Sequence, residues 1–405
     1  MSGTVGDLSP KQADILGKFK ENVKDILKPN HDDYHLTKWL RARDFDLQKA
    51  EAAIRNDAAW RNDNNVDTIL EDYKVPEVIE KYFVGGICGR DKEGCPIWID
   101  TFGDLDIRGM LCSAKKQDIL KSKVHLLERI NNIFTEESTP ERRVEGLVVI
   151  IDLEKMGMKH LWKPGMDMMN SILAMFEEHY PETLKISFAI NAPRIFPIIY
   201  NLARPFLNEN TIKKVHVLGA DYKQVLLKYI DPDQLPVYWG GTKTDPDGNP
   251  KCPSLINLGG DIPSSYFCNV LNDLDGFTQV DIGRGSSLQL DYEITVKRSV
   301  IRYQFKTDGF DLGFGIYRRT RNKRQSAGDM AAVMASERVN SHLVPEDGSF
   351  TCKETGTYVV RFDNTYSWTR GKKLFYLIEI LEPDVHDLDI QDDTISELSN
   401  SSDKS

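Results

Sequence analysis

The stretch GLVVIIDL, residues 146–153, decides how the central part of this chain folds. It contains an unbroken run of four β-branched residues, which is the pattern of a strand buried on both faces of a sheet. Helical spacing flanks it at 115–136 and 164–178, and further strand patterns follow at 183–191 and 213–219. Strands that alternate with helices predict right-handed crossovers and therefore a mainly parallel sheet.

The segments before this stretch extend the sheet and add helices. Residues 83–102, FVGGICGRDKEGCPIWIDTF, predict two strands joined by a charged, glycine-containing turn. The earlier residues have helical spacing, with Ser9 as the candidate N-cap and Pro10 at the first helical position. We therefore expect a helical module over 1–75 and an α/β domain over 76–244.

The last third of the chain has a different pattern. Residues 245–274 are rich in turn-forming residues and predict a linker, and strand-like runs over 275–382 predict an antiparallel β-sandwich. Residues 383–405 are acidic and poor in apolar side chains, so we expect them to be disordered. The expected fold class is multi-domain: an α/β domain with N-terminal helices, followed by an all-β domain.

The composition narrows the class of function. The chain has 405 residues, 40% of them hydrophobic, and a net charge of −10, whereas a general nucleic-acid binder would carry a basic footprint. Its six cysteines form no CxxC pair, which favours a reduced cytoplasmic chain over a disulfide scaffold or a zinc site. The first residues lack a signal-peptide pattern, and no apolar run reaches about 18 residues. We expect a cytoplasmic protein whose contact with membranes is peripheral and transient.

Motifs for catalysis or for cofactor binding are missing from the sequence. It has no GxxxxGK[ST], GxSxG or HExxH, and GFGIYRR does not match GxGxxG. Residues 245–250, DPDGNP, contain the residue types of a calcium loop but lack its spacing and its closing glutamate, so we interpret them as a turn. We expect neither an enzyme nor a resident metal or cofactor.

The stretch NAPRIFPIIYNLARPFL, residues 191–207, is unusually apolar. On a helix over 194–207, Arg194, Asn201 and Arg204 share one narrow stripe, and apolar side chains cover about three quarters of the surface. Such a helix is either buried in a large core or in contact with lipid. Its 14 residues are too few to cross a bilayer, which takes about 20.

Five motifs in order point to a known family: KWLRARDFDLQKA, IIDLEKMGM, HYPETLKISFAINAPRIF, RPFLNENTIKKVHVLG and LPVYWGGT. Together they resemble the CRAL-TRIO lipid-transfer family. The later stretches GFGIYRRT, NSHLVPEDGSFTCKETGTYVVRFDNTYSW and KKLFYLIEIL are similar to a GOLD β-sandwich, and the pairing resembles the tocopherol-associated subgroup of the family. The resemblance implies a carrier that holds one hydrophobic lipid in a cavity and exchanges it at membranes.

The resemblance also gives the apolar stretch a role. In the family, the helix that matches 194–207 is a gate over the mouth of the cavity, so both its inner and its outer face are apolar. Prolines at 193, 197 and 205 would shape and hinge this gate. The implied cavity and gate residues are Leu147, Val149, Ile195, Phe196, Ile199, Tyr200, Leu202, Phe206 and Leu207.

A lipid headgroup site follows from the family prototype, a phosphatidylinositol/phosphatidylcholine transfer protein. The positions that hold its inositol headgroup match Arg43, Glu182, Thr211 and Lys214. Arg and Lys would neutralise the phosphate, while Glu and Thr would bind the ring hydroxyls. The alternative is that Glu182 and Lys214 form an ion pair and Arg43 braces the helical module. The prototype has an arginine where this chain has Thr183, which weakens the headgroup assignment.

The side chains that contact the choline lipid in the prototype are replaced by apolar ones in this chain. A serine and a threonine that contact the choline lipid match Leu147 and Val149. Leaving a buried phosphate without hydroxyl partners would cost about 1–3 kcal/mol or more. Phosphatidylcholine is therefore disfavoured, and we expect a mostly apolar ligand such as tocopherol, a retinoid or squalene, with phosphatidylinositol as an exchange partner.

A basic cluster interrupts the β-rich part of the chain within IYRRTRNKRQ, residues 316–325. Its members are Arg318, Arg319, Arg321, Lys323 and Arg324. On an exposed loop these charges would attract anionic lipid, each contributing about 1 kcal/mol near a membrane surface. A nuclear localisation signal and a merely solvated loop are the alternatives.

Two hypotheses of function remain from the sequence. The first is a lipid carrier that exchanges its ligand at membranes. The second is a lipid-sensing regulatory adaptor, because GOLD domains elsewhere recruit cargo or adaptor proteins, which implies a protein partner here. A change such as Phe206→Asp would stop transfer by a carrier, whereas an adaptor's partner binding could persist.

Overall fold

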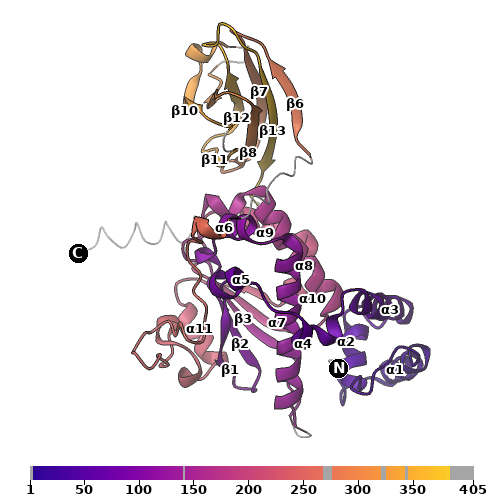
Figure 1. The fold of residues 1–405 in the computed structure, drawn as a ribbon. Helices are drawn as coiled ribbons and strands as arrows, with labels where there is room; N and C mark the ends of the chain where they lie inside the picture. Colours follow the sequence, from indigo (N-terminus) through magenta and orange to yellow (C-terminus); the bar gives the residue numbers. More distant parts are fainter. Residues whose placement is uncertain (1–2, 140–141, 268–275, 321–324, 343–344, 384–405) are drawn as a thin grey trace. The chain divides into compact units, whose positions relative to one another are not determined.

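The computed structural model describes residues 3–139, 142–267, 276–320, 325–342 and 345–383 (Figure 1). These residues form two compact units. The first unit contains residues 3–156, 167–193 and 203–267, and the second contains 157–166, 194–202 and the described residues from 276 onward. The domain boundaries expected from the sequence stay predictions. Residues 268–274 of the expected linker and 384–405 of the expected tail lie outside the described residues.

The first unit is built on a five-stranded sheet in the order β1-β2-β3-β4-β5. β1 is antiparallel to β2, and the remaining neighbours are parallel, which confirms the predicted mainly parallel sheet. The strands are β1 (Gly86–Arg90), β2 (Pro96–Asp100), β3 (Leu147–Asp152), β4 (Leu184–Ile190) and β5 (Val215–Val217).

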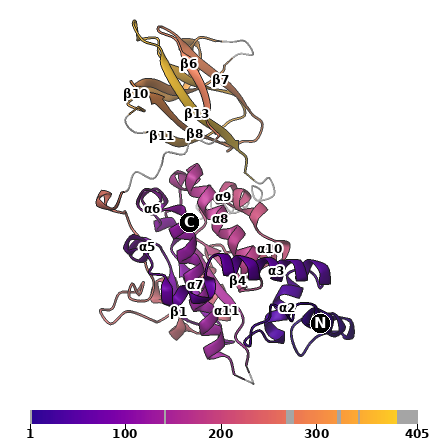
Figure 2. The ribbon, with the colours of Figure 1, turned by 45° about the vertical axis from the view of Figure 1, so that its right-hand side comes forward.

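The strand order determines on which face of the sheet the connecting helices lie. Strands β2 to β5 lie side by side in the order of the sequence, so right-handed crossovers place the connecting helices α7 and α8 on one face of the sheet. Figure 1 shows α7 and α11 on opposite sides of the sheet, and in the turned view of Figure 2 the two helices overlap. The helices of this part are α6 (Ile107–Ser113), α7 (Lys116–Glu137), α8 (Lys163–His179), α10 (Glu209–Lys213) and α11 (Tyr222–Tyr229).

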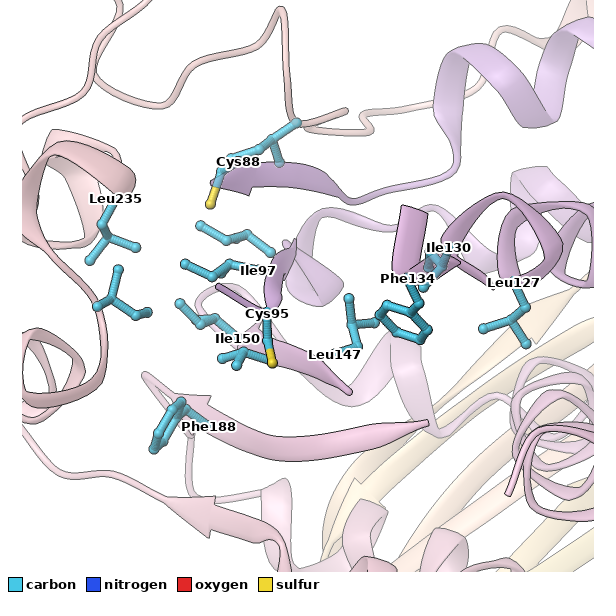
Figure 3. Close-up of a cluster of buried hydrophobic side chains, with 14 of the residues drawn as sticks. Cys88, Cys95, Ile97, Leu127, Ile130, Phe134, Leu147, Ile150, Phe188 and Leu235 are labelled. Carbon is cyan, nitrogen blue, oxygen red and sulfur yellow. The ribbon is translucent and has the colours of Figure 1, made fainter. Parts of the chain in front are cut away.

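The face of the sheet that α11 covers, here called the α11 face, is buried over most of β2, β3 and β4. Its side chains pack against Leu226 of α11 and against Leu235 and Trp239, which follow α11 in the chain. Figure 3 shows Ile97, Ile150 and Phe188 on the side toward Leu235. Six apolar side chains that the strands contribute to this face are no more than 1% exposed: Ile97, Ile99, Val148, Ile150, Phe188 and Ile190. Ile186, near the start of β4, is half-buried.

The opposite face, here called the α7 face, is filled less completely. Leu147 is buried and lies toward Phe134 of α7 (Figure 3), but Val149 and Ile151 further along the strand are only half-buried. The neighbouring Trp98 is also half-buried. The prediction that this strand is buried on both faces is therefore wrong for its second half, because the helices on this side do not cover these side chains fully.

The N-terminal helices pack around an apolar cluster of their own, which includes Phe19, Leu36 and Leu40. The predicted N-cap is present, since Ser9 and Gln12 exchange side-chain to backbone hydrogen bonds in a capping box. These helices are α1 (Pro10–Asn22), α2 (Asp33–Arg41), α3 (Leu47–Asp63), α4 (Ile69–Asp72) and α5 (Glu77–Tyr82).

Charged side chains attach the N-terminal helices to the rest of the first unit. Arg61 of α3 donates two hydrogen bonds, both of 3.0 Å, to the Glu128 carboxylate of α7. His179 at the end of α8 contacts Asp57 of α3 at 3.0 Å, with both side chains buried. Its ring also stacks on Trp60, with ring centroids 3.6 Å apart. The helical module is thereby held firmly against α7 and α8.

The second unit contains two four-stranded antiparallel sheets, in the orders β10-β9-β12-β7 and β11-β8-β13-β6, which confirms the predicted all-β part. A shared aromatic core includes Phe305, Phe314 and Phe362, whose ring centroids lie 4.6–5.4 Å apart. The strands are β6 (Thr278–Ile282), β7 (Ser287–Ile294), β8 (Val300–Asp308), β9 (Leu312–Arg318), β10 (Ala331–Val339), β11 (Glu346–Thr351), β12 (Gly356–Asp363) and β13 (Lys372–Leu381).

Residues 157–166 belong to the second unit through specific contacts. The buried Arg302 of β8 donates a 2.9 Å hydrogen bond to the Leu161 carbonyl oxygen and pairs with Glu379 of β13 at 2.7 Å. The glycine at position 315 permits close strand packing, because a Cβ there would lie 2.9 Å from Cα of Ser336 in the neighbouring strand.

The continuous helix predicted over 194–207 is wrong. The α-helix α9 covers only Phe196–Ala203, and a 3₁₀ turn over Arg204–Phe206 follows it. Pro205 explains the break, because a proline lacks the backbone N–H and disfavours helical geometry at the residue before it. Pro197 lies in the first turn of α9, where a proline is tolerated, and its side chain is buried.

We predict that Asp152→Ala destabilises the first unit. The buried carboxylate at the end of β3 accepts hydrogen bonds from the Trp239 indole at 2.9 Å and the Asn191 amide at 2.8 Å. Removing the acceptor leaves these donors unsatisfied, so the free energy of unfolding should fall by about 3 kcal/mol. Urea unfolding followed by tryptophan fluorescence measures this change. Asp63→Ala, at an exposed position of α3, is the control, and a loss no larger than in this control would contradict the role of Asp152.

Candidate functional site

Glu182 is the centre of a charged cluster between α8 and β4. It adopts a left-handed backbone conformation with φ of 58°, which is uncommon for a residue other than glycine. Its Oε2 accepts hydrogen bonds from Arg41 at 2.9 Å and from Lys214 at 3.1 Å. The Glu182 side chain is 11% exposed, so this cluster is shielded from water on most sides.

Two further contacts position Lys214 in this cluster. Its Nζ also donates to the Leu184 carbonyl oxygen at 2.8 Å, and its backbone N–H donates to the Thr211 carbonyl oxygen at 3.0 Å. Thr211 itself lies in α10, which Asn208 caps through a 2.8 Å bond to the Thr211 N–H. The structure thus brings Glu182 and Lys214 together and links Thr211 to Lys214 through the backbone. Their role in binding a headgroup stays a prediction.

Arg41, and not Arg43, completes the charged cluster. Arg41 is the last residue of α2, and its guanidinium reaches Glu182. Arg43 follows the helix and donates instead to the carbonyl oxygen of Ala42. Both arginines occur in the motif WLRARDFD, and only the exact end of the helix decides which of them faces Glu182. The sequence alone therefore could not identify Arg41 as the arginine that contacts Glu182.

The charges in this cluster are already compensated. Glu182 neutralises Arg41 and Lys214 in part, which corresponds to the ion-pair alternative expected from the sequence. An anionic headgroup at this place would have to compete with the Glu182 carboxylate for both cations.

The α7 face of the sheet carries polar groups that were not predicted from the sequence. The strand register places Asp100 of β2 beside Ile151 of β3 and Trp98 beside Val149. Lys123 of α7 interacts electrostatically with Asp100, and its Nζ lies 3.3 Å from the ring centroid of Phe83. An acid and an amine are therefore located among the apolar side chains of this face.

Burial shifts the pKa values of both groups toward their neutral forms. It raises the pKa of the Asp100 carboxyl to about 6, although the Lys123 charge and Trp98 act in the opposite direction. It lowers the pKa of the Lys123 amine to about 8, against the attraction of the Asp100 charge. Both values reflect the cost of holding charge away from water.

The predicted gate residues lie on α9, on the turn after it and at the positions directly before and after these two elements, Ile195 and Leu207. Ile199 is buried, whereas Phe206 is 39% exposed, which is large for an aromatic side chain. The rings of Phe196 and Tyr200 lie one turn apart, with centroids 5.8 Å from each other. The half-buried members of the predicted set are Ile195, Phe196, Tyr200, Leu202 and Leu207.

Two members of the predicted basic cluster are held by the β-sandwich. Arg318 at the end of β9 donates to the Thr355 carbonyl oxygen at 2.8 Å, and Arg319 pairs with Asp291 of β7. These contacts reduce the charge available to an anionic membrane. The other three members, Arg321, Lys323 and Arg324, lie outside the described residues.

Two kinds of feature are absent from the described residues. In this part of the chain, no group of three or more His, Cys, Asp or Glu side chains could hold a metal ion. Within the same residues, no helix is both long enough and apolar enough to cross a membrane.

Comparison with known proteins places this chain in a family. A model of the CRAL/TRIO domain matches residues 80–241. Protein ctg-1 of Caenorhabditis elegans is 31% identical, and the match covers 87% of this chain and 92% of that protein. The crystal structure of Sfh5 offers a structural likeness with a TM-score of 0.48 and 16% identity, over 59% of this chain and 88% of that chain.

Longer proteins are also similar to this chain. Protein real-time of Aedes aegypti is 28% identical over 93% of this chain, which spans 62% of that protein. The CRAL-TRIO domain-containing protein T23G5.2 of Caenorhabditis elegans is 31% identical over 80% of this chain, which spans 46% of that protein. The domain match at 80–241 and the near full-length match to ctg-1 lead to one conclusion: the chain belongs to the CRAL-TRIO family of lipid-binding and lipid-transfer proteins.

Proposed function

We propose that this protein carries one mostly apolar lipid against the α7 face of its sheet and exchanges that lipid at membranes. The unequal burial of the two sheet faces is the observation that supports this most directly. On the α11 face Val148 and Ile150 are fully buried, whereas Val149 and Ile151 of the same strand are half-buried on the α7 face. Protein interiors are normally packed to a uniform density, so an incompletely filled apolar face favours a ligand site.

The side chains of the α7 face favour an apolar ligand. Trp98, Val149 and Ile151 are apolar, and so is Leu147 at the start of the strand. One hydroxyl, that of Ser187, lies beside Val149 in the strand register. Burying a hydrocarbon chain here would contribute about 0.8 kcal/mol per CH₂. Tocopherol, a retinoid or squalene fits this surface better than phosphatidylcholine does.

Exchange at a membrane requires an apolar segment that can enter the bilayer surface. The stretch 195–207 supplies one, and Phe206 is exposed in a turn directly after α9. Aromatic side chains are favourable at the membrane interface. We propose that this stretch is the gate and that the loaded protein meets membranes only transiently, from the cytoplasm.

The rival function is a lipid-sensing adaptor, in which lipid occupancy controls binding of a protein partner through the C-terminal β-sandwich, proposed to be a GOLD domain. A regular β-sandwich with its own aromatic core can present such a binding surface. Neither function needs a catalytic residue, and we propose that the protein is not an enzyme.

Organic extraction of the purified native protein, followed by mass spectrometry, tests the proposed function. We expect about one tocopherol, retinoid or squalene molecule per chain. Phosphatidylcholine as the only bound lipid would contradict the proposal. Phosphatidylinositol as the only bound lipid would support the charged cluster around Glu182 as a headgroup site.

We predict that Val149→Trp blocks loading. The larger side chain would occupy space on the α7 face that the lipid otherwise fills, so uptake of tocopherol from vesicles should fall at least about tenfold. Val149→Leu, which adds one methylene, is the matched control and should retain most uptake. Thermal unfolding of both variants would show that the fold is intact. Normal uptake by the folded Val149→Trp variant would place the ligand elsewhere.

We predict that Phe206→Asp slows vesicle-to-vesicle transfer at least about tenfold while ligand already bound stays bound, because a charge at the gate opposes entry into the bilayer. Val237→Asp changes a side chain of similar exposure, 42% against 39%, outside the gate and should leave transfer unchanged. Equal effects of the two changes would contradict a specific gate. Retained partner binding by Phe206→Asp would favour the adaptor.

Loading with phosphatidylinositol distinguishes Arg41, which lies in the charged cluster, from Arg43, which the family resemblance implied. If the cluster binds this headgroup, Arg41→Met and Lys214→Met should each reduce loading about tenfold, the effect of one lost bond to a charged group, and Arg43→Met should not. Vesicles that contain radiolabelled phosphatidylinositol give the measurement, with tocopherol uptake as the control for folding. A loss with Arg43→Met alone would restore the assignment made from the sequence.

A further inference from the structure

Lys123 interrupts an apolar stripe of α7. Positions 120, 123, 127, 130 and 134 alternate in spacing between three and four residues and therefore share one face of the helix. Leu127, Ile130 and Phe134 of this stripe are buried in the main core of the first unit. An apolar residue is expected at position 123, where the chain instead has a lysine that is only half-buried.

Asp100 interrupts the apolar surface of the sheet in the same way. Its neighbours on the α7 face are Ile151 and, two residues earlier in β2, Trp98. One carboxylate oxygen, Oδ1, is buried and has no hydrogen-bond partner among the described residues. Nearly all buried polar atoms in proteins are hydrogen-bonded, so an unsatisfied carboxylate oxygen requires an explanation.

The two groups face one another without closing into an ion pair. Each affects the pKa of the other, yet no direct ion pair between Asp100 and Lys123 forms in the described part of the chain. The Lys123 ammonium lies instead over the ring of Phe83, 3.3 Å from its centroid. The charged pair that fixes α3 to α7 differs, because Arg61 and Glu128 bond directly at 3.0 Å. A pair that only stabilised the fold would be expected to close similarly.

We propose that Asp100 and Lys123 form the polar end of the lipid site and bind a hydroxyl group of an otherwise apolar lipid. The Lys123 ammonium donates a hydrogen bond to the lipid oxygen, and Oδ1 of Asp100 accepts one from the lipid hydroxyl. The surrounding face accommodates the hydrocarbon part. This inference rests on the proposed carrier function and narrows its ligand to a hydroxyl-bearing lipid, against a pure hydrocarbon such as squalene.

The shifts in pKa agree with this arrangement. Burial raises the pKa of Asp100 to about 6 and lowers that of Lys123 to about 8, so near pH 7 the acceptor and the donor are both largely in their charged forms. A bound hydroxyl would satisfy both groups, whereas a hydrocarbon would leave them uncompensated. Selectivity therefore arises from the polar pair and not from the shape of the site alone.

Competing lipids test the inference on the full chain. Wild-type protein, Lys123→Met and Asp100→Leu would be loaded from phosphatidylcholine vesicles that contain either α-tocopherol or squalene. Both substitutions preserve side-chain size and remove the polar group. We expect tocopherol affinity to fall about tenfold in each, which is the effect of losing a hydrogen bond to a charged group, while squalene affinity stays the same or rises.

The controls separate binding from folding. Lys121→Met changes an exposed lysine of α7 two positions away and should leave both affinities unchanged. Lys123→Gln retains a donor and should keep tocopherol affinity within about threefold of wild type. Equal changes for both lipids, or no change for tocopherol, would overturn the inference. A wild-type chain that takes up neither lipid would contradict the proposed function itself, and the inference with it.

Discussion

Close packing of the central sheet on one face only is the constraint on which the first unit depends. The α11 face is sealed by Leu226, Leu235 and Trp239, so the strands are held in place without a complete second layer. The strand order directs α7 and α8 to the other face, where hydrogen bonds of Arg61 and His179 fix them to the N-terminal helices. Leu127, Ile130 and Phe134 of α7 are buried in the same core, yet Val149 and Ile151 on this face stay half-buried.

Most of the fold could be predicted from the sequence because it depends on local patterns. The β-branched run at 148–151 and the helical spacing around it are enough to indicate a parallel sheet. The unequal burial of its faces could not be predicted, since the run from Val148 to Ile151 has the same pattern whether a helix covers a side chain fully or in part. The helix predicted over 194–207 was too long, because its apolar pattern continues through Pro205, where the helical backbone cannot.

The site could be predicted less well than the fold. Glu182 and Lys214 come together because Glu182 lies just before β4 and Lys214 is the C-cap of α10, two places that the family motifs define. Arg41 depends on the last residue of α2, and helix ends are the least certain part of a pattern. Asp100 and Lys123 are far apart in sequence, and each has the appearance of an ordinary surface charge until the sheet register and the helix face are known.

Burial of four cysteine side chains lowers their reactivity toward oxidants. Burial raises the pKa of the Cys88 thiol to about 12 and that of Cys352 to about 11, and it also raises the pKa values of Cys95 and Cys252. The thiolate is the form that reacts with peroxides, and at neutral pH these four side chains hold almost none of it. Burial alone therefore makes these four thiols poor targets for oxidation at neutral pH.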